Sequence, residues 1–503
     1  MNILNPAIRG YIKLRRSYIE HYTNNPINAQ ITTFNDLIGR AQFTEFGKKY
    51  NFPNINDFKD FKKNVPIHTY EDIFPYIKRM MDGEQNILWP SPIQWFAKSS
   101  GTTSEKSKFI PVSDESIEEN HFRGARDILA LYYNNFPESE FMSGKILIVG
   151  GSHKVNKHNE EVHYGDLSAV LMQNMASWQH TVRTPSLDIA LMEEWEAKLE
   201  LMALETAKED VRYIAGVPTW TAVLLNKIKE QSGVNDIHEI WPNLELYIHG
   251  GVNFEPYKEQ FANFFPTKRI NYLDTYNASE CFIAVQDIVG EDGMLLCTKH
   301  SVFYEFMPLE ELEKEHPTTL QLDEVALGTS YAVIISTNSG LWRYALGDTI
   351  AFTSLYPFRI KVTGRTKHFI NAFGEELMIE NSEHAITVAC KKTNAHLQDY
   401  TAAPIYFTDT SNGAHQWLIE VEIAEDQKEN FVAILDQELQ NVNSDYEAKR
   451  YKDLALRAPE VTFVKAGTFT NWLKSKNKLG GQHKIPRLSN DRKIIEEIMQ
   501  FTA

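Results

Sequence analysis

Hydroxyl side chains and lysines are concentrated around a single glycine between positions 98 and 113. This stretch reads K-S-S-G-T-T-S-E-K-S-K-F-I-P-V-S. Five hydroxyl side chains, Ser99, Ser100, Thr102, Thr103 and Ser104, lie on either side of Gly101, and Lys106 and Lys108 follow them. Backbone amides beside a glycine, short hydroxyl groups and flexible lysines are donors that can surround a polyphosphate. Ordinary polar hairpin turns use the same residue types, so the stretch alone leaves both interpretations open.

The sequence on either side of this loop narrows its structural type. Apolar residues with strand propensity precede it at 93–97 and follow it at 108–112, which predicts a strand on each side. The G-x-x-x-x-G-K-[ST] phosphate loop instead joins a strand to a helix, and its spacing does not occur in this stretch. We therefore expect a strand–loop–strand unit.

The elements that must position this loop are predicted helices alternating with short apolar strands. Two of the strands, at 145–149 and 244–248, open onto pairs of glycines. In a parallel α/β sheet, strand ends of this type surround the ligand crevice. Helices are expected at 35–50, 55–63, 70–83, 114–136, 186–209 and 217–231.

Strands dominate the sequence after Gly293, and a smaller unit begins near Gly364. The strands of the first part are expected at 294–298, 302–307, 332–337 and 358–362. The smaller unit combines predicted helices at 382–393 and 427–441 with predicted strands at 404–407, 417–423 and 461–464. We therefore divide the chain into a large N-terminal domain, 1–363, and a small C-terminal domain, 364–503.

Length and composition limit the classes of protein to which the chain can belong. Its 503 residues exceed what one hydrophobic core usually supports. A net charge of −16 argues against general binding of nucleic acid or of an anionic membrane surface. The first residues lack the apolar core of a secretory signal, and no run is long enough to span a bilayer. A cytoplasmic protein is the resulting expectation.

Three later motifs connect the loop to a larger system. They read Y-L-D-T-Y-N-A-S-E at 272–280, L-W-R-Y-A-L-G-D at 341–348 and V-T-G-R-T-K-H-F-I-N-A-F-G-E-E at 362–376. In this order and at these separations they resemble the nucleotide motifs of the adenylate-forming superfamily, which includes acyl-CoA ligases and luciferases. With Q-H-K-I-P-R at 482–487, they are more similar to the acyl-acid amido synthetases of the plant auxin-responsive (Gretchen Hagen) family and their bacterial relatives. The resemblance runs from about Phe43 to Arg487.

The resemblance implies a fold and a reaction. The implied fold is α/β, with a large N-terminal domain of β-sheets flanked by helices, a β-barrel-like part, and a small mobile α+β lid domain that rotates about residues 363–367. The implied enzyme uses ATP and Mg²⁺ to convert a small carboxylic acid into an acyl-adenylate, with release of pyrophosphate. It then transfers the acyl group to an amino acid or another amine.

The resemblance also implies roles for individual residues. The catalytic residues would be Lys484 and Glu280, and Glu280 would also be the ligand of the metal. The phosphates of ATP would contact Ser99, Ser100, Gly101, Thr102, Thr103 and Lys108. The rest of the nucleotide would contact Gly250, Gly251, Tyr276, Ser279, Asp348 and Arg365.

The residues themselves leave simpler roles open for several of these side chains. Tyr276 could fill a core, Asp348 could form a turn, and Lys484 could be a solvated lysine in a glycine-rich loop. Arg343 is either a phosphate or ribose ligand or a structural ion pair. Trp220 could pack against an aromatic acid or belong to the core.

Two other functions compete with the amide ligase. An acyl-CoA ligase would take the same adenylate to a thioester, and a nucleotide-binding protein would not turn over at all. The complete set of predicted phosphate, metal and lysine positions argues against the second of these. The acceptor, the acyl acid and the oligomeric state are not determined by these motifs.

Overall fold

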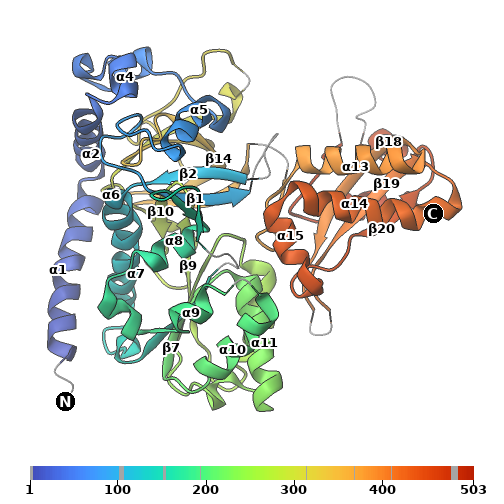
Figure 1. Ribbon diagram of the computed structural model, residues 1–503, viewed down its shortest axis with the longest axis horizontal. Coiled ribbons are helices and arrows are strands. Elements are labelled where there is room, and N and C mark those ends of the chain that lie inside the picture. Colours follow the sequence, from blue (N-terminus) through green and yellow to red (C-terminus); the bar gives the residue numbers. More distant parts are fainter. Residues whose placement is uncertain are drawn as a thin grey trace.

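The computed structural model describes residues 4–100, 107–150, 155–192, 194–312, 314–366, 369–408, 411–476 and 485–502. Figure 1 shows a large lobe and, at the other end of the long axis, a small lobe built from the C-terminal part of the chain. Helix α1 (Leu4–Asn24) lies on the outer side of the large lobe, away from the small one. Within the described ranges, the helices are too short or too polar to cross a membrane.

One mixed sheet of eleven strands runs through the large lobe. Its order is β12-β13-β14-β15-β11-β10-β9-β8-β7-β3-β6, antiparallel from β12 to β9 and parallel from β9 to β6. The strands are β3 (Lys145–Val149), β6 (Arg183–Thr184), β7 (Val211–Gly216), β8 (Leu246–Gly250), β9 (Asn271–Asn277), β10 (Phe282–Val285), β11 (Met294–Leu296), β12 (Val302–Pro308), β13 (Ser330–Thr337), β14 (Tyr344–Leu355) and β15 (Phe358–Arg365). The predicted mixed α/β class is confirmed. The antiparallel strands, which we expected to form a barrel-like part, continue the parallel strands in the same sheet.

A second sheet carries the ends of the hydroxyl-rich loop. Its order is β2-β1-β5-β4, with β1 antiparallel to β2 and parallel to β5. The strands are β1 (Trp95–Ser100), β2 (Ser107–Val112), β4 (Asn156–Lys157) and β5 (His163–Gly165). The predicted strand–loop–strand unit is therefore confirmed.

The N-terminal helices differ in their boundaries from the prediction. The helix expected over 35–50 is two helices, because the Thr44 hydroxyl caps a new helix by accepting from Gly47 N at 2.9 Å. Gly47 is required there, since a Cβ atom would lie 2.2 Å from the carbonyl oxygen of Ala41. The helices that follow α1 are α2 (Pro26–Ala41), α3 (Glu45–Lys49), α4 (Phe58–Asn64) and α5 (Tyr70–Met81).

The helix expected over 114–136 is interrupted by a wider turn. It consists of α6 (Asp114–Ser116), the π-helical turn η2 (Ile117–His121) and α7 (Phe122–Asn135). The remaining helices of the large lobe are α8 (Leu167–Gln173), α9 (Leu187–Ala190), α10 (Trp195–Thr206), α11 (Pro218–Ser232) and α12 (Lys258–Phe264).

The small lobe is an α+β unit. Its sheet has the order β18-β19-β20, and a short pair, β16-β17, precedes it. The strands are β16 (Phe369–Ile370), β17 (Leu377–Met378), β18 (His396–Ile405), β19 (Ala414–Glu422) and β20 (Glu460–Val464). The helices are α13 (Ile379–Thr393), α14 (Lys428–Val442), α15 (Ser444–Arg450), α16 (Thr468–Ser475) and α17 (Lys493–Met499). Strand β18 begins eight residues before the strand expected at 404–407. The sequence did not indicate this start, because the first three residues of β18 are exposed and only one of them, Leu397, is apolar.

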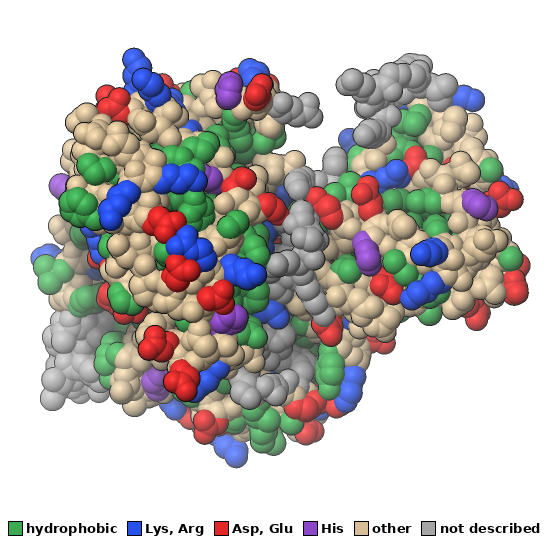
Figure 2. Space-filling model, turned by 45° about the horizontal axis from the view of Figure 1, so that its top comes forward, with side chains coloured by type: hydrophobic (Ala, Val, Ile, Leu, Met, Phe, Trp, Pro, Cys, Tyr) green, Lys and Arg blue, Asp and Glu red, His purple; other side chains and the backbone are tan. Residues whose placement is uncertain are grey.

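The two lobes share one hydrophobic cluster, which includes Trp220 and Phe261 from the large lobe and Phe373 and Trp417 from the small one. Two hydrogen bonds at this contact go to backbone carbonyls. The Thr219 hydroxyl donates to Phe373 O at 3.1 Å, and the Tyr257 hydroxyl donates to Ala372 O at 2.5 Å. On the face seen in Figure 2, an open notch separates the lobes beyond this contact.

Candidate active site

A buried carboxylate lies at the centre of the predicted nucleotide residues. Asp348 accepts from the Tyr276 hydroxyl at 2.5 Å and from Arg365 Nε at 2.7 Å. The other end of the Arg365 guanidinium donates to Glu376 at 2.8 Å. Tyr276, Asp348 and Arg365, which are far apart in the sequence, are therefore brought into one network.

The sheet explains this convergence. Arg365 is the last residue of β15 and lies directly opposite Asp348 on β14. Gly347, with φ +92°, precedes Asp348, and its carbonyl accepts from Thr366 N at 2.9 Å, which holds the end of β15 in place. Burial raises the pKa of Tyr276 well above its ordinary value, so the phenol stays a donor to Asp348.

Both oxygens of Asp348 are thus engaged before any ligand binds. Each carboxylate oxygen has a second lone pair, so the side chain keeps the capacity to accept further hydrogen bonds. The positive charge of Arg365 is paired with the carboxylates of Asp348 and Glu376. Burial alone would lower its pKa, but Glu376 and Asp348 raise it overall.

Glu280 lies in the turn between β9 and β10, together with Ser279, and both are half-buried. Burial raises the pKa of Glu280 to about 7; the charge of Lys108 opposes this rise, and the charges of Glu376 and Asp348 add to it. In the described part of the chain, its only hydrogen-bond donor is its own backbone amide. Among the described residues, no lysine or arginine hydrogen-bonds to this carboxylate.

Lys108, at one end of the hydroxyl-rich loop, lies close enough for its charge to act on this carboxylate. Ser99 on β1 lies opposite Lys108 on β2. The Lys108 ammonium is 5.5 Å from the ring centre of Tyr70, and the Tyr70 hydroxyl accepts from Phe109 N at 2.8 Å. Ser100 is described by its backbone alone, at the end of β1. The predicted phosphate ligands Gly101, Thr102 and Thr103 lie outside the described residues.

The glycine pair after β8 lies against the neighbouring strand. A Cβ atom at Gly250 would lie 2.4 Å from Thr275 O, and Gly251 has φ +81°. The carbonyl of Gly251 accepts from the Asn371 amide of the small lobe at 3.0 Å. This pair therefore marks the place where the small lobe meets the sheet. The predicted catalytic residue Lys484 lies outside the described residues.

Arg343 is a structural residue. Its side chain is buried and forms an ion pair with Glu305 at 2.8 Å, while its Nη1 donates to Val65 O at 2.7 Å. These contacts use the guanidinium away from the nucleotide network. Of the two roles that the sequence left open for Arg343, the structure supports the ion pair.

Replacing Arg343 with methionine should destabilise the protein by about 3–5 kcal/mol, because it leaves the buried charge of Glu305 without a partner. Urea unfolding measures this change. The double variant Arg343→Met, Glu305→Gln should recover part of the loss, since it removes both charges. Equal stability of the single variant and the wild type would contradict the structural role.

Trp220 belongs to the core. It is 2% exposed, and the Lys449 ammonium of the small lobe lies 4.6 Å from its ring centre. Burial lowers the pKa of Lys449, and Asp445 and Glu375 oppose this effect. The tryptophan is therefore part of the contact between the lobes.

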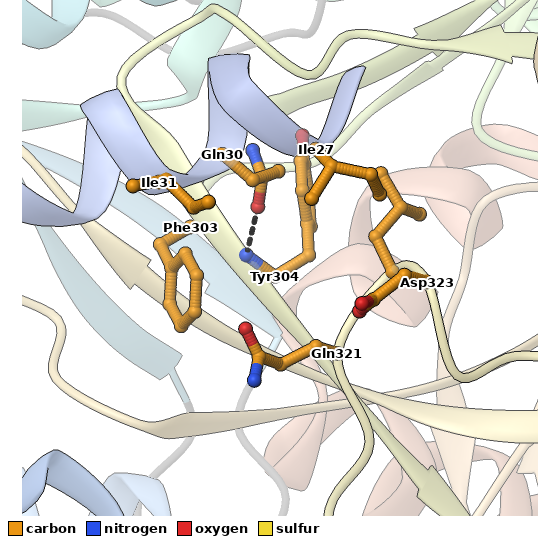
Figure 3. A pocket seen from close by; sticks show the side chains of 8 residues that line it. Ile27, Gln30, Ile31, Phe303, Tyr304, Gln321 and Asp323 are labelled. Atoms are coloured by element: carbon orange, nitrogen blue, oxygen red, sulfur yellow. Dashed lines mark hydrogen bonds between the residues drawn. The ribbon is translucent and has the colours of Figure 1, made fainter. Parts of the chain in front are cut away.

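A separate pocket lies between α2, β12 and residues 321–323, as shown in Figure 3. At its wall, the Gln30 amide group accepts from Tyr304 N at 2.9 Å, as Figure 3 shows, and donates to Val302 O at 3.0 Å. The pocket has a volume of about 10 Å³, enough for roughly one water molecule. It is too small for an acyl acid or a nucleotide.

Comparison with known proteins places these residues in a family. The GH3 family N-terminal domain matches residues 15–270, the central domain matches 295–365 and the C-terminal domain matches 380–493. The chain belongs to the GH3 family. The resemblance drawn from the motifs is therefore confirmed.

Two curated GH3 relatives come from Arabidopsis thaliana. The probable indole-3-acetic acid-amido synthetase GH3.1 is 22% identical, over 98% of this chain and 94% of the relative. The 4-substituted benzoates-glutamate ligase GH3.12 is 21% identical, over 95% of each chain. A solved acyl acid amido synthetase, in complex with 2,4-DB, has a TM-score of 0.64 at 18% identity, covering 98% of this chain and 96% of that one. That structure supports the GH3 fold.

Two residues of this GH3 site were missed by the sequence reasoning. Glu376 pairs with Arg365 and has φ +40°, a left-handed backbone that is uncommon outside glycine and that clusters at functional sites. Tyr70 supports Lys108 and Phe109. Glu376 lies inside the motif at 362–376, and Tyr70 lies at the start of a predicted helix, but neither residue type gave a separate signal.

Proposed function

We propose that this GH3 protein is an ATP-dependent acyl acid amido synthetase. It activates a small carboxylic acid as an acyl-adenylate and transfers the acyl group to an amino acid or another amine. The observation that carries this proposal is the joined network of Tyr276, Asp348, Arg365 and Glu376 beside Glu280 and Lys108, in a chain whose relatives are named as amido synthetases.

The described residues fit a divalent cation next to phosphate. Among the described residues, three acidic side chains, Glu280, Asp348 and Glu376, lie near two cations, Arg365 and Lys108, so acidic groups outnumber basic ones here. Mg²⁺ prefers one or two carboxylates, with phosphate oxygens as further ligands. Glu280 would hold Mg²⁺, and the bound ion would supply charge stabilisation to the phosphates.

The chain's own residues would divide the work on ATP. Asp348 would accept hydrogen bonds from the ribose hydroxyls, with its orientation fixed by Tyr276 and Arg365. Lys108 and Ser99 would contact the phosphates with the loop 100–103. The carboxylate of the acyl acid attacks the α-phosphate, and pyrophosphate leaves with the developing charge, which fixed cations stabilise.

The small lobe would close over the nucleotide. This proposal divides the chain at 363/364 and assigns Lys484 to the adenylation step. The contact of Asn371 with Gly251 O supports it, because it joins the small lobe to the predicted nucleotide residues. A cytoplasmic location is part of the same proposal.

The product assay tests the function directly. With ATP, Mg²⁺, a pool of small aryl and alkyl acids and the twenty amino acids, the protein should form an N-acyl amino acid detectable by mass spectrometry. Coenzyme A in place of the amino acids should give little thioester. Acyl-CoA without amide would favour the acyl-CoA ligase. Absence of ATP–pyrophosphate exchange with every acid would favour a nucleotide-binding protein without turnover.

A further inference from the structure

The π-helical turn η2 holds the segment that carries Glu280. Such turns interrupt the regular hydrogen bonds of an α-helix and occur frequently at functional sites. Asn120 and His121, the last two residues of η2, are 1% and 3% exposed. Both side chains bond to the β9–β10 hairpin, which is distant in the sequence.

Asn120 fixes the C-terminal end of the hairpin turn. Its Oδ1 accepts from Phe282 N at 2.6 Å, and its Nδ2 donates to Phe282 O at 3.1 Å. The same Nδ2 donates to His300 O at 2.9 Å. The buried side-chain amide of Asn120 therefore bonds to three backbone groups, namely Phe282 N, Phe282 O and His300 O. These bonds hold this end of the turn in a defined position.

His121 fixes the N-terminal end of the β9–β10 turn. Its Nδ1 lies 3.0 Å from Asn277 Oδ1. Burial lowers the pKa of His121 to about 4, with the hydrogen bond to Asn277 opposing the shift, so the ring is neutral at neutral pH. Because an amide oxygen can only accept, Nδ1 carries the hydrogen and donates it.

Glu280 lies between these two fixed points. The turn is closed by a hydrogen bond from Ala278 N to Cys281 O at 2.9 Å. No other described residue hydrogen-bonds to the Glu280 carboxylate, and the backbone of the turn sets the position from which this side chain extends. A carboxylate that binds a cation needs that backbone to be held before the cation arrives.

We infer that Asn120 and His121 are positioning residues that hold the β9–β10 turn so that Glu280 is placed for the divalent cation. The inference rests on the proposed role of Glu280. It extends the active site to a helix that the nucleotide motifs do not include. Residues that support metal ligands affect metal affinity or activity by about 10- to 100-fold.

A matched pair of variants at position 121 separates positioning from packing. In His121→Asn the amide Nδ2 lies at the same distance along the side chain as the imidazole Nδ1, so the donor to Asn277 can be kept. In His121→Leu the volume is largely kept and the donor is lost. Met307→Ala, on β12, opens a cavity in a separate hydrophobic cluster and serves as the control.

Two measurements follow. In the free protein, amide hydrogen exchange of the peptide spanning residues 278–282 should be faster in His121→Leu than in the wild type, and restored in His121→Asn. In ATP–pyrophosphate exchange, His121→Leu should raise the Mg²⁺ concentration for half-maximal rate by about tenfold. His121→Asn should stay close to the wild type, and Met307→Ala should change neither reading.

The inference is overturned if His121→Leu and His121→Asn exchange alike at 278–282, or if both keep the Mg²⁺ response of the wild type. If His121→Leu fails to fold, Asn120→Asp is used instead. This change keeps the acceptor for Phe282 N and removes the N–H groups that donate to Phe282 O and His300 O. Unchanged exchange at 278–282 in that variant also overturns the inference. A wild-type protein without pyrophosphate exchange would refute the proposed function, whereas hydrogen exchange would still test the positioning of the turn.

Discussion

Replacing Lys484 with alanine should slow the formation of the acyl-adenylate by about a hundred- to a thousandfold, the typical effect of losing one well-placed transition-state donor. Lysine suits this role because its compact charge is carried on a flexible stem. Pyrophosphate release measures the rate. The melting temperature should stay near that of the wild type, because a residue that acts in the transition state need not contribute to folding.

The matched control for this variant is Lys474→Ala, which removes an exposed lysine from α16 in the same small lobe. That change should leave pyrophosphate release unaffected. If Lys484→Ala retained adenylation within a few-fold of normal, or lost activity only together with its folded structure, the assignment of Lys484 to catalysis would be wrong.

Glu280→Gln should lower the rate of adenylation by about a hundredfold when Mg²⁺ is limiting, because even residues around a metal ligand can cost 10- to 100-fold. Glutamine keeps the size of the side chain but removes the charge that a hard cation needs. Additional Mg²⁺ should restore part of the activity, since the phosphates remain as ligands. The measurement is ATP–pyrophosphate exchange over a series of Mg²⁺ concentrations.

Glu291→Gln provides the comparison for this second prediction, because Glu291 is an exposed acid after the same hairpin. Its Mg²⁺ response should match that of the wild type. A Glu280→Gln variant whose response to Mg²⁺ is the same as that of Glu291→Gln would refute the role of Glu280 as the metal ligand.

The sequence predicted those parts of the site whose signal is local. The strands around the hydroxyl-rich loop were predictable because apolar residues flank a polar segment, and β1 and β2 pair as expected. The helix α5 was predictable because Gly83, with φ +104°, follows its end. These features depend on neighbouring residues, which periodicity and turn residues describe well.

Contacts between distant segments were not predictable in this way. The role of Arg343 depends on Glu305, which lies 38 residues earlier in the chain and meets it through the pairing of β12, β13 and β14. The π-helical turn was also missed, because nothing in the pattern of residues 114–136 distinguishes it from a regular α-helix. Glu376 became recognisable only when the fold placed it against Arg365.

Two of the hydrogen bonds between the lobes have an evolutionary consequence. The acceptors of Thr219 and Tyr257 are the backbone carbonyls of Phe373 and Ala372, and every residue type carries such a carbonyl. Substitutions at 372 and 373 can therefore accumulate while these bonds persist, whereas the donor side chains are constrained. Among homologues that retain this contact, we expect the selective pressure to fall mainly on one partner of each bond, so that covariation between the paired positions would be weak.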